Sequence, residues 1–461
     1  MSRDVVIIGG GITGLAAAHR LQSTLGPGAV TLLECTDTLG GKIRSQRQGE
    51  FLLEAGPDSI LVSRPAGLQL CRELGIASRL VGTEPHAAPS QVKRGDRLFP
   101  LPAGFSGLVP SRRSQLLASR LLSLPGRIRA VLEPLVPPAG GEADESVGAF
   151  FRRRFGREAY SRLFEPLLAG IHAGDGDQLS LDATFPQVRE LERTAGSVLK
   201  GMRGREQAAV PLGAAFMTFP GGLAELVNAL AEQLNGTDLR TSSGAIAVEA
   251  DRPGYRVILA CGSSISTHAL IIATPAHAAA PLLAALDAEL ASCLRSIPHV
   301  HTAVVSLAYQ RADVHHPLPG YGYLSPRIEG GPVVACTFVS RKFAGRAPSH
   351  THLFRCFIGR HGNDASALAD QAELVRLARA ELRRTLGIYA EPIMAQVVRW
   401  PGGMPQYTLG HRDRVDAIMQ GATRWPRLAL AGASFGGVGI PDCIASGWRA
   451  ADALAPALVP T

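Results

Sequence analysis

The stretch Val5-Val-Ile-Ile-Gly-Gly-Gly-Ile-Thr-Gly14, followed by Leu15-Ala-Ala-Ala-His-Arg-Leu21, decides the fold. Its four leading apolar residues predict a buried strand, and the apolar spacing after Gly14 predicts a helix. Gly9 allows a tight turn, Gly11 lets the backbone approach a pyrophosphate, and Gly14 lets helix and strand pack closely. The helix N-terminus then faces the phosphates. Unless these glycines form only a turn that binds nothing, the stretch predicts a dinucleotide site.

Two features after this stretch extend the site. The strand 30–33 completes a βαβ unit and ends at Glu34, whose carboxylate can accept hydrogen bonds from ribose hydroxyls. A second glycine pair, in Gly40-Gly-Lys-Ile-Arg44, and the loop Glu54-Ala-Gly-Pro-Asp-Ser59 follow closely. An NAD site needs neither, whereas the amine oxidase branch of the glutathione-reductase-like flavoproteins carries a similar G-G-x-x-R element. This resemblance favours FAD over NAD.

Two later segments resemble further pieces of the same domain. Residues 219–230 begin with a Gly-Gly helix start, and strand-like stretches follow at 245–248, 255–260 and 269–275. Near the end, 427–433 predicts a strand, 434–444 a glycine-rich loop and 445–454 a helix. In flavoproteins of this type, that helix points its N-terminus at the pyrimidine end of the flavin, where it stabilises negative charge.

The composition limits the class of protein. At 461 residues and 46% hydrophobic, the chain can bury a large core. No run approaches the roughly 18 apolar residues that a membrane span needs, and the apolar run Val5–Ile8 after Met1–Asp4 is too short for the apolar region of a signal peptide. The seven cysteines are scattered without a C-x-x-C pair, so neither a disulfide framework nor a zinc site is expected. A reducing cytoplasm is the expected location.

The net charge of +8 raises the question of an anionic partner. No basic patch interleaved with aromatic residues is present, so nucleic acid is not expected. Only four of the 47 basic residues are Lys. One explanation for the excess of Arg is the codon composition alone. The alternative is a carboxylate-bearing ligand or a surface of lipid headgroups, both of which guanidinium groups bind well.

Four motifs together resemble one family. They are Gly56-Pro-Asp-Ser59, Ala169-Gly-Ile-His-Ala-Gly-Asp175, the segment Trp400–His411 with its Pro-Gln-Tyr-Thr-Leu-Gly-His ending, and Gly432–Ile444. From first strand to last helix, the chain resembles protoporphyrinogen oxidase and the coproporphyrin-forming coproporphyrinogen oxidases. Carotenoid desaturases and amine oxidases would share the terminal motifs but not Ala-Gly-Ile-x-Ala-Gly-Asp. A non-enzymatic prenyl-protein carrier of the same fold would lack flavin.

The resemblance implies a set of non-covalent FAD contacts along the motifs. These are Gly9, Gly10, Gly11, Ile12, Thr13, Gly14, Glu34, Gly41, Lys42, Gly56, Pro57, Asp58, Ser59, Ala245, Trp400, Val438, Gly439 and Ile440. Relatives vary at Lys42, so only its backbone is expected to touch the cofactor. The alternative for Trp400 is a buried anchor without a cofactor role.

The resemblance also implies a substrate clamp in which apolar side chains hold one pyrrole near the flavin. It falls on Tyr321, Leu324, Phe357 and the backbone of Gly170, with ordinary core packing as the alternative. Arg64 stands where a basic residue can pair with a substrate propionate. His172 replaces an aromatic residue that relatives often carry, which argues against stacking there. No catalytic side chain and no metal site is predicted.

The implied reaction is dehydrogenation of a porphyrinogen in haem synthesis. The CH₂ bridges of the porphyrinogen give hydride to flavin N5, and O₂ then reoxidises the flavin with release of H₂O₂. Three such two-electron rounds complete the porphyrin. The mainly apolar clamp favours protoporphyrinogen IX, which has two propionates, over coproporphyrinogen III, which has four. The sequence leaves open a peripheral contact with the inner face of the cell membrane and transfer of the porphyrin to a downstream chelatase.

These segments predict an α/β fold with a discontinuous Rossmann-like FAD-binding domain, formed by 1–75, 215–285 and 395–461. An α+β substrate domain is expected at 286–394, with adjoining parts of 76–94, because strand-like stretches alternate with one helix there. The insert 95–210 is expected to be mainly helical and to lie at the substrate entrance. Its amphipathic helices either face a membrane or pack against the other domains.

Overall fold

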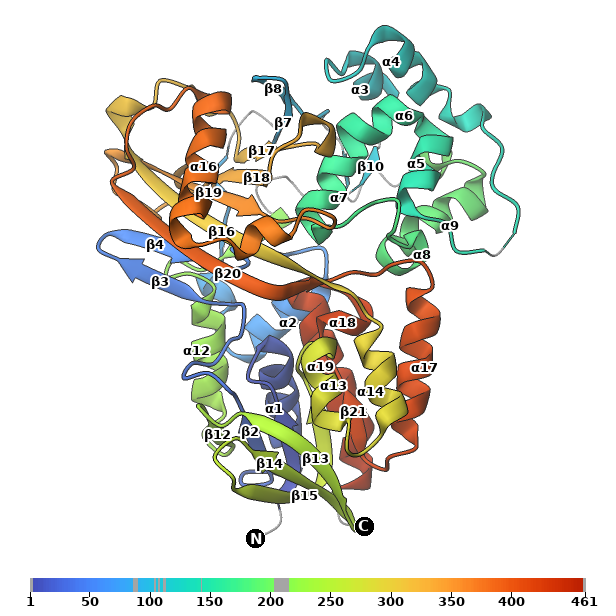
Figure 1. Ribbon diagram of the computed structural model, residues 1–461, viewed down its shortest axis with the longest axis vertical. Coiled ribbons are helices and arrows are strands. Elements are labelled where there is room, and N and C mark those ends of the chain that lie inside the picture. Colours follow the sequence, from blue (N-terminus) through green and yellow to red (C-terminus); the bar gives the residue numbers. More distant parts are fainter. Residues whose placement is uncertain are drawn as a thin grey trace.

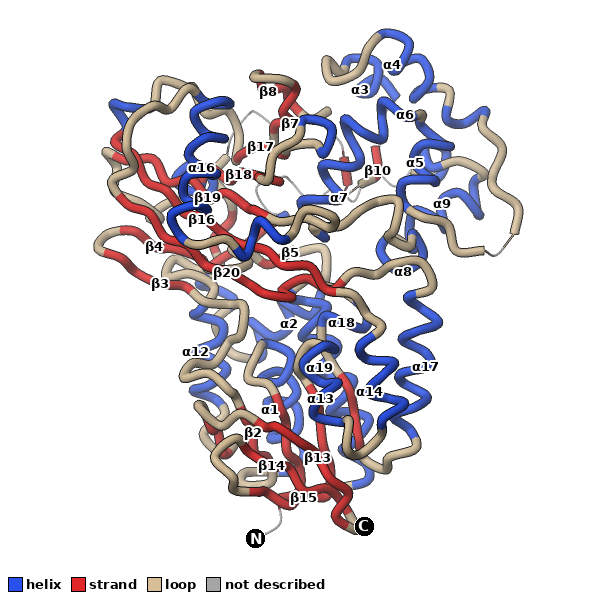
Figure 2. Tube along the Cα trace, viewed as in Figure 1, coloured by secondary structure: helices blue, strands red, loops and turns tan. Residues whose placement is uncertain are grey.

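The computed structural model describes residues 3–85, 90–102, 105–106, 108–110, 113–141, 143–202 and 215–458. Figures 1 and 2 show three parts: a sheet flanked by helices in the lower half, a second sheet at upper left and a mainly helical region at upper right. The predicted α/β fold, with one sheet built from distant parts of the chain, is confirmed.

The first sheet has the strand order β12-β2-β1-β15-β14-β13, and β21 also pairs with β15. Strand β1 lies at its centre, parallel to both β2 and β15. Val5, Val6 and Ile7 of β1 are fully buried, because helices cover both faces of the sheet. The strands are β1 (Arg3–Ile8), β2 (Val30–Leu33), β12 (Asp238–Arg240), β13 (Ala245–Asp251), β14 (Gly254–Leu259), β15 (Ser264–Ile272) and β21 (Leu428–Leu430).

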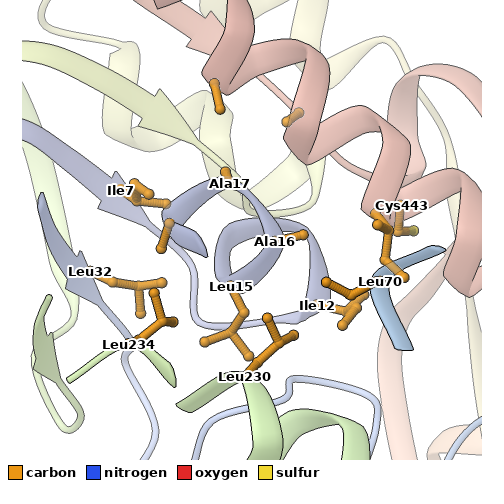
Figure 3. Close-up of a cluster of buried hydrophobic side chains, with 14 of the residues drawn as sticks. Ile7, Ile12, Leu15, Ala16, Ala17, Leu32, Leu70, Leu230, Leu234 and Cys443 are labelled. Atoms are coloured by element: carbon orange, nitrogen blue, oxygen red, sulfur yellow. The ribbon is translucent and has the colours of Figure 1, made fainter. Parts of the chain in front are cut away.

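Alternate residues of β1 face two separate layers of helices. Val5 and Ile7 pack against α1 (Ile12–Leu25), α2 (Pro65–Glu73), α12 (Ala224–Gln233) and α19 (Ile440–Leu454), which form the layer shown in Figure 3. Val6 and Ile8 pack against the opposite layer of α13 (Ala276–Leu283), α14 (Ala288–Arg295) and α17 (His411–Thr423).

The second sheet has the order β20-β16-β19-β18-β17-β7-β8. One face packs on α16 (Gln371–Leu386), and the other faces the first part of the molecule. We expected the FAD-binding domain to resume at 395, but β20 pairs with β16 as far as Pro405, so this segment belongs to the second sheet. The strands are β7 (Gln91–Arg94), β8 (Arg97–Pro100), β16 (His299–Gln310), β17 (Gly322–Leu324), β18 (Val333–Phe338), β19 (Thr351–Ile358) and β20 (Met394–Pro405).

The helical region packs around buried aromatic rings, among them Phe151 and Phe164, which stack at a centroid distance of 4.1 Å. Arg154 is fully buried and forms an ion pair with the fully buried Glu133. The inner faces of these helices therefore pack on one another, whereas the expected alternative to a membrane contact was packing against the other domains. Its helices are α3 (Arg113–Ala118), α4 (Leu124–Val131), α5 (Val147–Phe155), α6 (Arg157–Ala159), α7 (Glu165–His172), α8 (Leu181–Thr184), α9 (Pro186–Ala195) and α10 (Val198–Gly201).

Short elements complete the described parts. A π-helical turn, Tyr160–Phe164, joins α6 to α7, and 3-10 turns lie at 77–79, 133–135, 311–313, 327–329, 365–368 and 455–457. The remaining helices and strands are β3 (Ser45–Gln48), β4 (Phe51–Glu54), β5 (Ile60–Leu61), β6 (Val81–Gly82), β9 (Phe105–Ser106), β10 (Val109–Pro110), β11 (Phe216–Thr218), α15 (Val339–Lys342) and α18 (Ala433–Gly436).

Gly14 allows α1 to approach β1, as the sequence predicts. A Cβ added to Gly14 would overlap the carbonyl oxygen of Gly9 in the turn before the helix. We therefore expect Gly14→Val to yield no folded, yellow protein, because neither backbone segment can move away cheaply.

The matched control is Gly140→Val, since no heavy atom lies within 4 Å of a Cβ added there. Flavin absorbance and circular dichroism of the purified variants measure the effect. A Gly14→Val protein with wild-type helicity and flavin content would contradict this account of the turn.

Candidate active site

The phosphate end of the site lies at the start of α1. Gly11 is the N-cap residue, and no side chain caps the helix there. A Cβ added to Gly11 would meet only Gly41 Cα, at 4.0 Å, so the backbone is open to a ligand. The first N–H groups of a helix lack partners within the helix and attract anions. This end of the site fits a pyrophosphate.

Glu34 lies beside the same turn. Its carboxylate accepts a hydrogen bond from the Gly10 backbone N–H at 2.8 Å and from the Thr36 hydroxyl at 2.8 Å. The loop before β13 also approaches it, because the Ser243 N–H donates to the Glu34 carbonyl oxygen at 2.8 Å. Ala245, the first residue of β13, therefore lies near Glu34, which fits the predicted adenosine end.

The second glycine pair packs directly on the first turn. The Gly40 N–H donates to the Gly10 carbonyl oxygen at 2.8 Å, and a Cβ added to Gly41 would lie 3.2 Å from Gly11 Cα. A Cβ on Gly56 would overlap the Lys42 carbonyl oxygen, so the two predicted cofactor loops lie against each other. Burial lowers the pKa of Lys42, which also lies near Cys443 of α19.

The flavin end is predicted around the turn between α18 and α19. Gly439 is the N-cap of α19, so Ile440 begins the helix, five residues earlier than the sequence suggests. A Cβ added to Gly447 would overlap the Thr13 carbonyl oxygen, so α19 crosses the start of α1 in close contact. The N-termini of the two long helices therefore lie on the same side of the first sheet.

Tyr407 holds this turn and was missed by sequence reasoning. Its hydroxyl donates to the Ala433 carbonyl oxygen and accepts a hydrogen bond from the Gly437 N–H at 2.8 Å. The ring is 1% exposed and stacks on His411 with centroids 4.2 Å apart. The only sequence signal was its place in Pro-Gln-Tyr-Thr-Leu-Gly-His, which gave no role.

Two buried histidines, His172 and His411, lie next to the ring of Tyr407. His172 contacts Phe185 edge-on, with ring centroids 5.5 Å apart, and lies 6.0 Å from the ring of Tyr407. Burial lowers the pKa of His172 to about 4. Burial, with the Arg414 charge, also lowers the pKa of His411 to about 4. Both rings are therefore neutral at pH 7.

The second sheet brings two of the predicted clamp residues into one row. Leu324 pairs with Ala335, Ala335 with Phe357, and Phe357 with Val304, so these side chains lie on one face of the sheet. A Cβ added to Gly170 would lie 3.0 Å from Leu324 Cδ2, so α7 approaches the end of the row. Gly170, Leu324 and Phe357 thus form a continuous, mainly apolar surface.

Tyr321 does not join this row. It precedes β17, and its hydroxyl donates to the Glu84 carbonyl oxygen. Arg64 lies at the start of α2 and pairs with Asp442 of α19 at 3.7 Å, with 56% of its side chain exposed. Arg64 is thus placed beside the flavin-end turn, with a carboxylate partner already present.

Two predicted cofactor contacts have protein partners for their polar atoms. The Trp400 indole N–H donates to the Ala55 carbonyl oxygen at 2.8 Å, as the buried-anchor alternative suggests. The Asp58 carboxylate is bound by Lys342 at 2.7 Å and by Arg355 at 3.3 Å. The roles predicted for Pro57, Ser59 and Val438 remain predictions.

No helix in the described ranges is long and apolar enough to cross a bilayer. Within the same residues, no three His, Cys, Asp or Glu side chains gather as metal ligands would. All seven cysteines are unpaired.

The glycine turn, the Glu34 carboxylate and the open N-terminus of α1 define a dinucleotide-binding protein. A family model described as flavin containing amine oxidoreductase matches residues 12–455. The chain belongs to this family and is an FAD-dependent oxidase, as the sequence predicts.

Similar proteins cover the whole chain. It is 34% identical to "Coproporphyrinogen III oxidase" of Bacillus subtilis and 34% identical to "Protoporphyrinogen oxidase" of Homo sapiens, with 98% of each chain covered in both cases. A crystal structure from Exiguobacterium, described as a candidate protoporphyrinogen oxidase, matches with a TM-score of 0.88 at 30% identity, covering 99% of both chains. A UDP-galactopyranose mutase with a TM-score of 0.75 and 18% identity shares the fold.

Neutral His172 makes stability depend on pH. The unfolded chain binds a proton at this histidine below about pH 6.5, whereas the folded protein does not until about pH 4. The free energy of unfolding therefore falls as the pH drops through this window. We expect His172→Phe, which keeps an aromatic ring, to reduce the loss between pH 7 and 5 by about 1–2 kcal/mol.

Urea unfolding of the holoprotein at both pH values measures this loss. His350→Gln is the control, because His350 is exposed and lies outside the buried group around Tyr407. An equal loss in His172→Phe and in the wild type would show that His172 is protonated in the folded state.

Proposed function

We propose that this oxidase dehydrogenates a porphyrinogen to a porphyrin in haem biosynthesis, with O₂ as the final electron acceptor. The observation that carries the proposal is the apolar row of Leu324, Ala335, Phe357 and Val304, which faces the cofactor loops and ends at Gly170. Relatives named for porphyrinogen oxidation, 34% identical over nearly the full length, support it.

FAD, when bound, supplies the hydride acceptor and passes the electrons to O₂. The residues suited to hold it are the Gly9–Gly14 turn, Glu34 and the N-terminus of α19. The substrate carbon that loses hydride is a CH₂ bridge in an apolar ring system. We therefore assign the chain the tasks of orienting the macrocycle against the row and keeping water from the reacting face.

Arg64 is the basic residue that we assign to a propionate. Its guanidinium is half-exposed at the edge of the flavin-end turn, and Asp442, 3.7 Å away, binds it only loosely. A propionate can add a second carboxylate to the same guanidinium, because Arg has five N–H donors. The contact is remote from the CH₂ bridge, so it contributes to binding more than to the chemical step.

Protoporphyrinogen IX is the substrate that we favour, because it places two vinyl groups against the apolar row. Coproporphyrinogen III, with four propionates, is the alternative, and three bacterial relatives are named coproporphyrinogen III oxidase.

A membrane contact is part of the proposal and is supported by an apolar edge of the helical region. Its exposed residues are Leu117, Leu124, Ile128, Leu132 and Leu135.

Steady-state assays with the two porphyrinogens test the reaction and the substrate. Porphyrin fluorescence and H₂O₂ are followed together. We expect protoporphyrinogen IX to give the higher kcat/KM. A value at least about tenfold higher for coproporphyrinogen III, roughly 1.4 kcal/mol of discrimination, would reverse the preference. If a yellow protein oxidised neither compound, the proposed function would be wrong.

Arg64→Ala is expected to raise KM more than it lowers kcat, at a cost of about 1–3 kcal/mol in kcat/KM. Asp442→Asn provides a matched comparison, because it frees Arg64 from its carboxylate and should leave KM unchanged or lower it. Unchanged kinetics in a folded Arg64→Ala protein would assign Arg64 to solvent, and loss of flavin would make it a structural residue.

The membrane contact is tested with vesicles. Leu124, Ile128 and Leu132 are four residues apart and lie along one side of α4 and its extension, with Arg120 exposed nearby. Leu124→Asn with Leu135→Asn should weaken binding to phosphatidylglycerol vesicles without changing the rate in detergent. A wild-type protein that does not sediment with the vesicles would contradict the proposed membrane contact.

We also propose that the flat, apolar porphyrin passes directly to a downstream chelatase.

A further inference from the structure

A buried charge cluster joins the cofactor loop 56–59 to the second sheet. Lys342, at the end of α15, binds both oxygens of the Asp58 carboxylate, at 2.7 and 2.9 Å. Arg355 of β19 approaches the same carboxylate at 3.3 Å and donates to the Glu54 carbonyl oxygen at 3.4 Å. The cofactor loop therefore meets α15 and β19, which lie more than 280 residues later in the chain, at one carboxylate.

Burial limits the movement of the charged side chains in this cluster. Asp58 is 9% exposed and Arg355 is 4% exposed. Burial alone would raise the pKa of Asp58, but the Lys342 and Arg355 cations hold it below its ordinary value. A charge buried to this degree is costly to separate from its partners, so the side chains are held in one arrangement.

Arg355 also touches a residue of the apolar row. Arg355 and Phe357 are two positions apart on β19 and therefore point to the same face of the sheet. The guanidinium carbon lies 4.8 Å from the centroid of the Phe357 ring. On the opposite face, Phe354, Cys356 and Ile358 belong to the core beneath α16. The ring of Phe357 is half-buried, so part of it remains open to a ligand.

We propose that Arg355 is a positioning residue: held by Asp58 and by the Glu54 carbonyl, its guanidinium fixes the ring of Phe357 in the orientation that receives a pyrrole. The inference rests on the proposed function, because it takes Phe357 to be part of the porphyrinogen clamp. It gives Asp58 a different task from direct cofactor contact. Loop 56–59 thereby sets the orientation of the Phe357 ring through the Asp58 carboxylate and the Arg355 guanidinium.

Arg355→Lys is the most informative variant, because Lys keeps the charge beside Asp58 but lacks the planar group that can contact both partners and the ring. We expect KM for the porphyrinogen to rise about 3–10-fold, kcat to change less than about twofold, and flavin content to stay at the wild-type value.

Arg346→Lys is the matched control. Arg346 is equally buried, at 2% exposed, and belongs to the neighbouring ion pair with Glu54, at 3.5 Å. Its guanidinium lies over Phe343, not over Phe357. If replacing any buried Arg near the cofactor loop disturbed substrate binding, KM would rise equally in both variants. Positioning of Phe357 predicts a raised KM in Arg355→Lys alone.

A double-mutant comparison separates positioning from stability. If Arg355 acts through Phe357, the variant Arg355→Lys/Phe357→Leu should have the KM of Phe357→Leu alone, because the ring that Arg355 orients is gone. Independent, multiplying effects of the two substitutions would overturn the inference, as would equal changes in KM for Arg355→Lys and Arg346→Lys.

A measurement without substrate keeps this test distinct from that of the proposed function. 4-Fluorophenylalanine at position 357 should give one sharp ¹⁹F resonance in holoprotein, a shifted or broadened one in Arg355→Lys, and an unchanged one in Arg346→Lys. An unchanged resonance in Arg355→Lys would overturn the positioning role. If the wild type oxidises no porphyrinogen, the proposed function fails, and the ¹⁹F spectra still decide whether Arg355 orients the ring.

Discussion

The close approach of three backbone segments at Gly14 and Gly447 is the constraint on which the rest of the structure depends. At Gly14, α1 lies against the turn that ends β1, and at Gly447, α19 lies against the first turn of α1. A side chain at Gly14 would push α1 away from the turn, and one at Gly447 would push α19 away from α1. Because both glycines are present, the middle of α19 packs on the start of α1, and the Gly40–Gly41 turn lies beside the open N-terminus of α1.

The second sheet is fixed to this framework by a small apolar cluster, in which Leu53 packs on Ala308 and Leu353, and by polar contacts. Trp400 donates to Ala55, Arg346 pairs with Glu54, and the Asp58 cluster joins loop 56–59 to β19. Of these contacts, the Asp58 cluster lies beside the apolar row, because Arg355 touches the ring of Phe357. Tyr407 similarly connects the segment after β20 to the flavin-end turn.

Sequence reasoning succeeds where neighbouring residues determine the structure. The turn at Gly9–Gly14, the strand before Glu34 and three strands of the second sheet, β16, β18 and β19, follow from local patterns of glycine and apolar residues, whereas β8 falls in the insert that was expected to be mainly helical. It fails where the partner is remote: Lys342 is 284 residues from Asp58, and nothing in the motif Gly56–Ser59 indicates that its carboxylate binds the other sheet. It also starts the last segment of the FAD-binding domain too early, at 395, because the pairing of β20 with β16 cannot be read from β20 alone.

A crystal structure of the protein with FAD and a bound porphyrin tests the central claim most directly. The account predicts the pyrophosphate at Gly11, the flavin ring at the N-terminus of α19, and one pyrrole between Gly170 and the ring of Phe357. An open cavity of about 490 Å³ elsewhere is lined by Arg94, Arg152, Arg157 and Arg162, of which Arg152 and Arg162 already pair with Asp177 and Glu329. A macrocycle in that cavity, with the row from Leu324 to Val304 free, would contradict the account.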